Sequence, residues 1–109
     1  MIQLPNKFAG SYQSHNQFAI IHGNQCRTWS DFYFQLKFAL QLPDYFGNNL
    51  DALEEVLQDL SEEPTGKTIY LIITDFKLLC LDEPESKKNI LLEILKEAES
   101  EHFKIITLG

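Results

Sequence analysis

Three short apolar runs divide the chain into alternating strand-like and helix-like parts. Residues 18–22, 68–74 and 103–108 are rich in β-branched, aromatic and other apolar side chains, and each run has the length of a strand. The first run is continuously apolar and stops at Gly23 and Asn24, which is the pattern of a strand covered on both faces. We expect the second strand to be buried as well.

Helical spacing fills the intervals between these strands. A first helix is predicted from a cap at Ser30 to about residue 41, a second at about residues 50–60, and a third at about residues 87–101. The apolar stripes of the three helices are Phe32, Leu36, Ala39 and Leu40; Leu50, Leu53, Val56, Leu57 and Leu60; and Ile90, Leu91, Ile94, Leu95 and Ala98. Strands joined through helices predict an α/β fold with a small three-stranded parallel sheet flanked by helices.

Aromatic residues crowd the first predicted helix. Trp29 precedes the predicted cap, and a residue in that place is expected to pack against Phe34 on the next turn. Tyr33, Phe34 and Phe38 lie off the inner stripe and are expected to cover neighbouring elements. Core packing therefore explains these rings better than stacking on a cofactor.

The connections carry their own signals. Pro43 ends the first helix, because proline biases the preceding residue toward an extended backbone. Gly47 permits a positive φ, and Asn48 or Asn49 can cap the second helix. After the second strand, residues 75–85 are expected to be irregular or to contain a short helix at residues 78–81.

The first 16 residues are polar, except that Leu4, Phe8 and Tyr12 recur at every fourth position. This spacing places three apolar side chains on one face of a helix. We expect one or two helical turns here that pack against the body of the protein.

Length and charge narrow the class of protein. At 109 residues and 44 % hydrophobic, the chain fits one domain. Sixteen acidic against nine basic side chains give a net charge of −7, which disfavours general binding to nucleic acid or to an anionic membrane and favours a basic protein or a cation as partner. The N-terminus has no basic segment followed by an apolar run, and no run approaches the roughly 20 apolar residues of a membrane span. We therefore expect a cytoplasmic protein.

The second predicted helix carries a row of carboxylates. Asp51, Glu55 and Asp59 are spaced four apart and share one face, with Glu54 and Gln58 beside them. A solvated helix face is the commoner explanation of such a row. Three features favour a binding surface instead: no basic side chain interrupts the row, an aromatic loop leads into it, and another helix repeats the pattern at Glu93, Glu97 and Glu101.

The aromatic loop before this helix contains Tyr45 and Phe46. Tyrosine offers a rigid apolar body with a polar tip and is enriched at binding hot spots, so Tyr45 is the better candidate for contact with a partner. For Phe46, burial in the core is as good an explanation as contact.

Patterns typical of enzymes are weak. Residues 66–68 resemble the end of a phosphate-binding loop, but the preceding residues include two glutamates and the segment leads into a strand instead of following one. The three histidines have no obvious nucleophile partner, and Cys26 and Cys80 lack metal-ligand spacing, so free buried thiols are expected. We expect no catalytic residue, no metal site and no cofactor.

The residues at positions 42–53, Leu-Pro-Asp-Tyr-Phe-Gly-Asn-Asn-Leu-Asp-Ala-Leu, closely resemble the barstar family of bacterial ribonuclease inhibitors. The similarity extends from about residue 18, through residues 97–101, to the terminal strand, and it divides the chain into an N-terminal extension at 1–16 and an inhibitor domain at 17–109. The resemblance implies three parallel strands flanked by helices. It also implies an intracellular protein that fills the active-site cleft of a basic, guanine-preferring ribonuclease.

The resemblance also implies a set of contact residues. The family's contacting tyrosine, loop glycine and loop asparagine fall on Tyr45, Gly47 and Asn49. Its two dominant aspartates fall on Asp51 and on Glu55, which is a longer replacement. Two family glutamates fall on Glu97 and Glu101. The partner-binding set expected for this chain is Tyr45, Gly47, Asn49, Asp51, Glu54, Glu55, Gln58 and Glu97.

Some positions depart from the family pattern. The best-known member has a tryptophan at the position of Glu54 and a glutamate at that of Asn48, and its threonine and second tryptophan are missing around residues 58–60. The main hypothesis is nevertheless a 1:1 inhibitor, or immunity protein, of a basic ribonuclease. The alternatives are an inhibitor-derived binding module for a basic non-nuclease partner or toxin, and a small metal-dependent enzyme that uses the same carboxylates.

Overall fold

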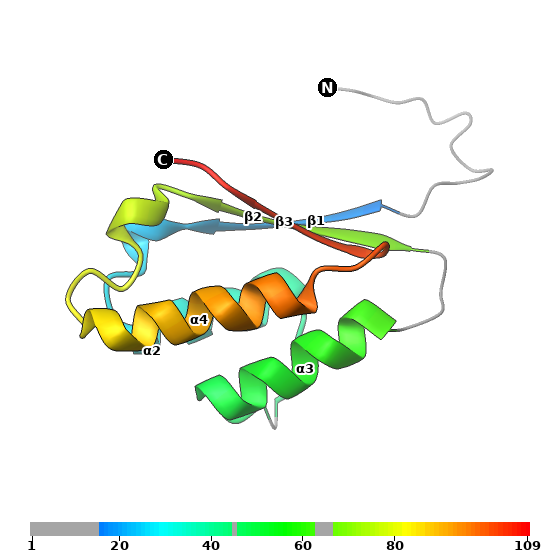
Figure 1. The fold of residues 1–109 in the computed structure, drawn as a ribbon, viewed down its shortest axis with the longest axis horizontal. Coiled ribbons are helices and arrows are strands. Elements are labelled where there is room, and N and C mark those ends of the chain that lie inside the picture. The colour runs from blue at the N-terminus through cyan, green and yellow to red at the C-terminus, as the bar shows by residue number, and fades with distance from the viewer. Residues whose placement is uncertain (1–15, 45, 63–66) are drawn as a thin grey trace.

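The computed structural model describes residues 16–44, 46–62 and 67–109. Within these ranges, three parallel strands form one sheet in the order β1–β2–β3, and helices lie between them along the chain (Figure 1). The elements are β1 (Asn16–His22), α2 (Trp29–Leu40), α3 (Leu50–Glu62), β2 (Thr68–Thr74), α4 (Glu85–Ala98) and β3 (Phe103–Thr107), with 3-10 turns at Gly23–Gln25 and Phe76–Leu78. The predicted α/β class with a small parallel sheet is confirmed.

The helices of the described chain all lie on one side of the sheet (Figure 1). Side chains alternate along a strand, and the inward set is buried against the helices. It consists of Ala19, Ile21, Ile69, Leu71, Ile73 and Phe103. The outward set is not covered by any described element: Phe18 is 62 % exposed and Ile20 is 49 % exposed. Within the described residues, the first strand is therefore covered on one face only, contrary to the expectation of cover on both faces.

The helices differ in their distance from the sheet. α2 packs against β1 and α4 packs against β3, whereas α3 packs chiefly against α4 and lies farther from the strands (Figure 1). α3 buries Leu53 and Leu57 and leaves its other side to solvent. Only one stripe of α3 is thus needed for packing.

α2 begins earlier than the sequence predicted. Thr28, not Ser30, is its cap, because the Thr28 Oγ1 accepts a hydrogen bond from the Asp31 N–H at 3.2 Å. Trp29 consequently belongs to the helix, and its ring lies 5.9 Å from that of Phe32 and 5.8 Å from that of Tyr33. The predicted contact between Trp29 and Phe34 assumed that the helix starts at the later residue. In the structure, Trp29 packs on Phe32 and Tyr33 instead, and Phe34 packs on Phe38.

Part of the predicted core is exposed. Tyr33 is buried as expected, but Phe34 and Phe38 are 64 % and 70 % exposed. Among the ring pairs of the described residues, these two rings contact each other edge-on, with their centroids 5.1 Å apart. The inner stripe of α2 already covers the sheet, so residues on the opposite face have no described element to cover. Ile90, which was predicted in the apolar stripe of the third helix, is 50 % exposed as well.

The ends of other elements also differ. The turn after β2 is a 3-10 helix at Phe76–Leu78, not a helix at residues 78–81. α4 starts at Glu85 and ends at Ala98, so Glu101 lies beyond the helix. No helix in the described ranges is long and apolar enough to cross a membrane.

Cys26 and Cys80 are both buried and free, as predicted. They lie in the turns that follow β1 and β2, and the Cys80 N–H donates to the Cys26 carbonyl at 2.7 Å. Burial raises the pKa of the Cys26 thiol from the ordinary value of 9.0 to about 11, and that of the Cys80 thiol to about 12. The fold therefore holds both thiols in their protonated form.

This burial predicts a loss of stability at alkaline pH. The unfolded chain releases these protons near pH 9, whereas the folded chain releases them only near pH 11 or above, so the free energy of unfolding should be steady below pH 9 and fall above it. The expected fall by about pH 10.5 is on the order of 1 kcal/mol for each thiol. Urea titrations across this range measure it. The Cys26→Ala/Cys80→Ala variant should lose stability less steeply, and an identical slope would contradict the assignment.

Candidate functional site

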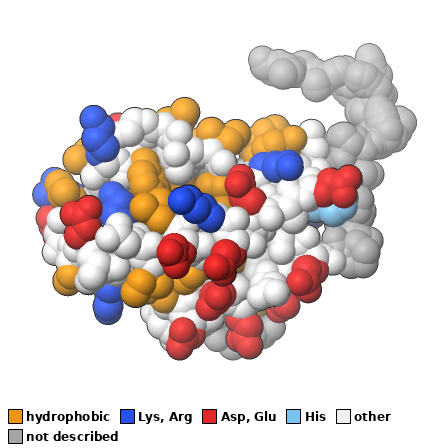
Figure 2. Space-filling view, in the orientation of Figure 1, with side chains coloured by type: hydrophobic (Ala, Val, Ile, Leu, Met, Phe, Trp, Pro, Cys, Tyr) orange, Lys and Arg blue, Asp and Glu red, His pale blue; other side chains and the backbone are white. Residues whose placement is uncertain are grey.

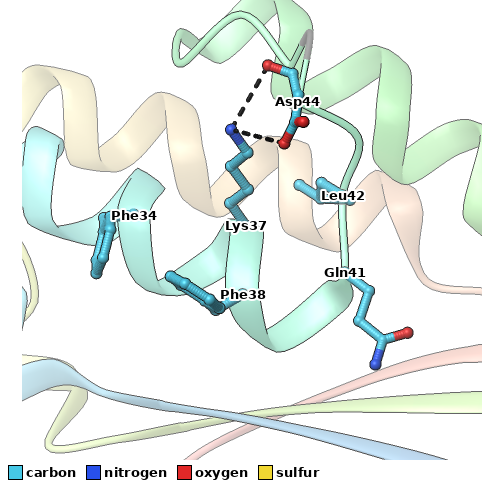
Figure 3. Close-up of a pocket in the computed structure, with 6 residues that line it drawn as sticks. All are labelled: Phe34, Lys37, Phe38, Gln41, Leu42 and Asp44. Atoms are coloured by element: carbon cyan, nitrogen blue, oxygen red, sulfur yellow. Dashed lines mark hydrogen bonds and ion pairs between the residues drawn. The ribbon is translucent and has the colours of Figure 1, made fainter.

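The loop between α2 and α3 is anchored on the last turn of α2. Gln41 ends the helix with φ 56°, and the Leu42 N–H donates to the Lys37 carbonyl at 2.9 Å. The Phe46 N–H donates to the Pro43 carbonyl at 3.0 Å. Lys37 Nζ reaches the Asp44 carbonyl at 3.5 Å and the Asp44 carboxylate at 3.8 Å (Figure 3). Backbone hydrogen bonds therefore hold the start of the loop, and Lys37 adds a long, exposed contact to Asp44.

An open pocket lies beside this anchor. The exposed rings of Phe34 and Phe38, with Leu42, form its apolar part, and Lys37 and Asp44 form its polar part (Figure 3). The two exposed rings thus form an aromatic patch next to the start of the loop.

Asn49 holds the other end of the loop. Its Oδ1 accepts from the Ala52 N–H at 2.8 Å, which makes Asn49 the cap of α3, and its Nδ2 donates to the Gly47 carbonyl at 3.0 Å. The sequence left Asn48 and Asn49 as alternatives, and the structure selects Asn49. Both polar atoms of its side chain are used within the chain, so Asn49 shapes the loop.

Gly47 has a different role from the one predicted. Its φ is not positive; Asn48 adopts the left-handed conformation instead, with φ 52°. A Cβ on Gly47 would lie 3.2 Å from both the Ala52 Cβ and the Asn49 Nδ2. Glycine therefore avoids a tight contact between the loop and the first turn of α3.

Of the two aromatic residues of the loop, the structure describes Phe46. Phe46 is buried, and its ring lies 6.1 Å from that of Tyr33, so it belongs to the core. Tyr45, the preferred contact candidate, lies outside the described residues.

The acidic row predicted on α3 is exposed throughout. Asp51, Glu54, Glu55, Gln58 and Asp59 all face solvent, while Leu53 and Leu57 are buried on the other side. In the part of the chain that the structure describes, the ion pairs are Arg27–Asp82 and Lys37–Asp44, and neither involves α3. Asp51, Glu54, Glu55 and Gln58 together line a shallow depression with Ala52.

Glu97 joins this row from another helix. A narrow cleft of about 100 Å³ runs between α3 and α4 and is lined by Glu54, Gln58, Glu97, Ile94 and Ala98. The apolar floor comes from α4, and carboxylates stand at both rims. Figure 2 shows acidic side chains gathered on this part of the molecule. Glu97 of α4 therefore shares one surface with Glu54 and Gln58 of α3, hereafter the acidic cleft.

One residue that positions the cleft was missed by the sequence analysis. Ser100, just after α4, donates from its Oγ to the Ser61 carbonyl in the last turn of α3 at 3.1 Å. The His102 N–H donates to the same Oγ at 3.1 Å. This hydroxyl ties the ends of the two helices together. No local signal marks it, because its partner lies 39 positions away.

A family model described as Barstar (barnase inhibitor) matches residues 16–106. The chain belongs to the barstar family. The match begins at the first residue of β1 and includes the loop, α3 and the whole acidic cleft. The resemblance inferred from positions 42–53 is thus confirmed, and the family is one of ribonuclease inhibitors.

The family match gives the surface a chemical context. Among the described residues, no group of three His, Cys, Asp or Glu side chains is arranged to hold a metal ion. What the surface offers is several carboxylates on two helices, with a loop of defined shape beside them. Such an arrangement is suited to cationic side chains of a partner, which bind carboxylates through charge-assisted hydrogen bonds.

The cap of α3 can be tested through stability. Asn49→Ala should lower the free energy of unfolding by about 1 kcal/mol, because it removes the acceptor of the Ala52 N–H. Asn49→Asp keeps that acceptor and loses only the donor to Gly47, so its cost should be clearly smaller. Urea unfolding of the three proteins measures both. Equal losses in the two variants would show that capping is not what Asn49 contributes.

Proposed function

We propose that this protein is a cytoplasmic inhibitor, or immunity protein, of a basic ribonuclease of the barnase type, which it binds one to one. The acidic cleft is the observation that carries the proposal, since Glu54 and Gln58 of α3 and Glu97 of α4 share one surface. Membership of a family of barnase inhibitors supports it. In this proposal the chain performs no catalysis itself.

The inhibitory chemistry follows from what a ribonuclease must bind. Its active site holds RNA phosphates with cationic side chains, and carboxylates can occupy the same places. Asp51 and Glu55 are one helical turn apart on the exposed face of α3, so both can enter one cleft of the enzyme. A helix presents them without the entropy cost of ordering a flexible segment.

The neighbouring groups would complete the contact. Tyr45, Gly47 and Asn49 would supply shape next to the first turn of α3. The loop is anchored on α2 by the hydrogen bond from the Leu42 N–H to the Lys37 carbonyl, and on α3 by the Asn49 side chain. Glu97 adds a carboxylate at the rim of the acidic cleft. Glu54 and Gln58 line both the depression with Asp51 and Glu55 and the acidic cleft with Glu97, so they would extend the contact from one to the other.

A pair of charge-removing variants tests the proposal. The Asp51→Asn/Glu55→Gln variant should inhibit a barnase-type ribonuclease of the same organism at least about 30-fold less tightly. This figure is the general cost of breaking close charge pairs at protein interfaces, among which the barnase–barstar pair of this family is itself a measured example. The matched control is Asp75→Asn/Glu85→Gln, which removes two carboxylates outside α3 and the acidic cleft. Titration of RNA cleavage against added inhibitor gives both affinities.

The outcomes of this titration are distinct. Full inhibition by the Asp51→Asn/Glu55→Gln variant would contradict the assigned contact residues. If the unaltered protein inhibits no co-encoded ribonuclease, the inhibitor hypothesis fails. Recovery of a basic partner without nuclease activity would then support the alternative, a binding module or immunity protein for another toxin.

Salt should act mainly on the rate of association. A surface with several exposed carboxylates attracts a basic enzyme over a distance, and ions screen this attraction. The association rate should fall roughly tenfold or more between about 50 mM and 1 M NaCl, with a smaller change in the dissociation rate. Stopped-flow mixing measures the two rates. A rate of association that does not change with salt would contradict an electrostatic encounter.

A further inference from the structure

The outward face of the sheet is an apolar surface that no described element covers. Parallel strands usually have both faces buried, because helical connections cover both sides. Here α2, α3 and α4 all lie on the other side (Figure 1). The exposed side chains therefore raise the question of what packs on them.

Two apolar rows cross this open face. Phe18, Tyr70 and Lys104 are register partners in one row, and Ile20, Ile72 and Ile106 are partners in the next. The rings of Phe18 and Tyr70 stack at 5.1 Å with an interplanar angle of 15°. Ile106 is 41 % exposed. The ten outward residues of the three strands include no carboxylate: Asn16, Phe18, Ile20, His22, Thr68, Tyr70, Ile72, Thr74, Lys104 and Ile106.

We propose that residues 1–15 of the same chain dock on this open face through Leu4, Phe8 and Tyr12. These residues lead directly into β1, which forms one edge of the sheet. Residues 4–12 would span about 13 Å as helical turns and residues 13–15 about 10 Å as an extended connection, which together match the roughly 23 Å of a seven-residue strand. The segment is therefore long enough to turn back and cross the face.

The chemistry of the segment fits the surface. Leu4, Phe8 and Tyr12 repeat at every fourth position, so one face of a helical turn would carry all three apolar side chains. Lys7 is the only Lys, Arg, Asp or Glu in residues 1–15, and it does not lie on that stripe. Neither the segment's stripe nor the apolar rows would have to bury a carboxylate.

The size of the face favours a tethered segment over a second copy of the chain. Three strands about 4.8 Å apart and about 23 Å long offer roughly 330 Å². A stable protein–protein interface needs about 800 Å² on each partner. A segment joined to β1 needs far less area, because its attachment gives it an effective concentration in the millimolar range.

A cycle of variants in the full chain tests this docking. The segment variant is Leu4→Ser/Phe8→Ser, and the face variant is Phe18→Thr/Ile20→Thr, which keeps residues suited to strands. Each should lower the Tm by about 4 °C or more. The combined variant should lower it by clearly less than the sum, since both changes remove the same contact.

Matched controls separate docking from a general loss of apolar surface. Gln3→Ser/Gln13→Ser changes the same segment away from the stripe and should leave the Tm within about 1 °C. Phe34→Gln/Phe38→Gln removes two rings that are equally exposed but lie on α2, and its effect should add to that of the segment variant.

Three results would overturn the proposal. They are an unchanged Tm in the segment variant, full additivity of the segment and face variants, and a dimer in sedimentation equilibrium that the face variant dissociates and the segment variant leaves intact. The last result would assign the open face to a second copy. None of these measurements involves ribonuclease inhibition, so the docking proposal and the proposed function can fail independently.

Discussion

The packing of α3 against α4 is the constraint on which the acidic cleft depends. α3 does not pack chiefly on the sheet, and it is held by the stripe that includes Leu53 and Leu57 and by the Ser100–Ser61 hydrogen bond at its end. A helix held along one stripe can carry almost any residue on the remaining faces. Because α3 packs on α4, the exposed side of α3 lies next to the edge of α4. Glu97 of α4 therefore lies beside Glu54 and Gln58 of α3.

This arrangement has an electrostatic cost. Carboxylates four apart on a helix disfavour it by roughly 0.2–0.5 kcal/mol for each pair, and Asp59 lies toward the negative end of the α3 dipole. The helix recovers stability at its start, where Asp51 lies near the positive end and Asn49 caps the first turn. Burial of Leu53 and Leu57, at about 1.5–3 kcal/mol for each side chain, outweighs the repulsion. The protein can therefore maintain a surface of one charge that a partner of the opposite charge would relieve.

The sheet, like α3, buries only one of its sides against other described elements. Three helices on one face bury a single core and leave the opposite face apolar and open. Among the described elements, the outward rows of β1, β2 and β3 therefore have no helix packed on them.

The sequence by itself determined the order of the elements, the bounds of β2, the fold class and the family. These follow from local properties: side-chain period, the positions of glycine, proline and asparagine, and one continuous motif. The cap at Thr28 is a local feature that the sequence analysis misplaced at Ser30, since the Thr28 hydroxyl and the Asp31 N–H are three positions apart. Tertiary structure alone decided that the Glu83 carboxylate accepts from the Trp29 N–H at 3.1 Å, that Phe34 and Phe38 are exposed, and that Glu97 lies beside Glu54. Each of these depends on which surfaces meet across long separations in the chain, and no local pattern encodes that.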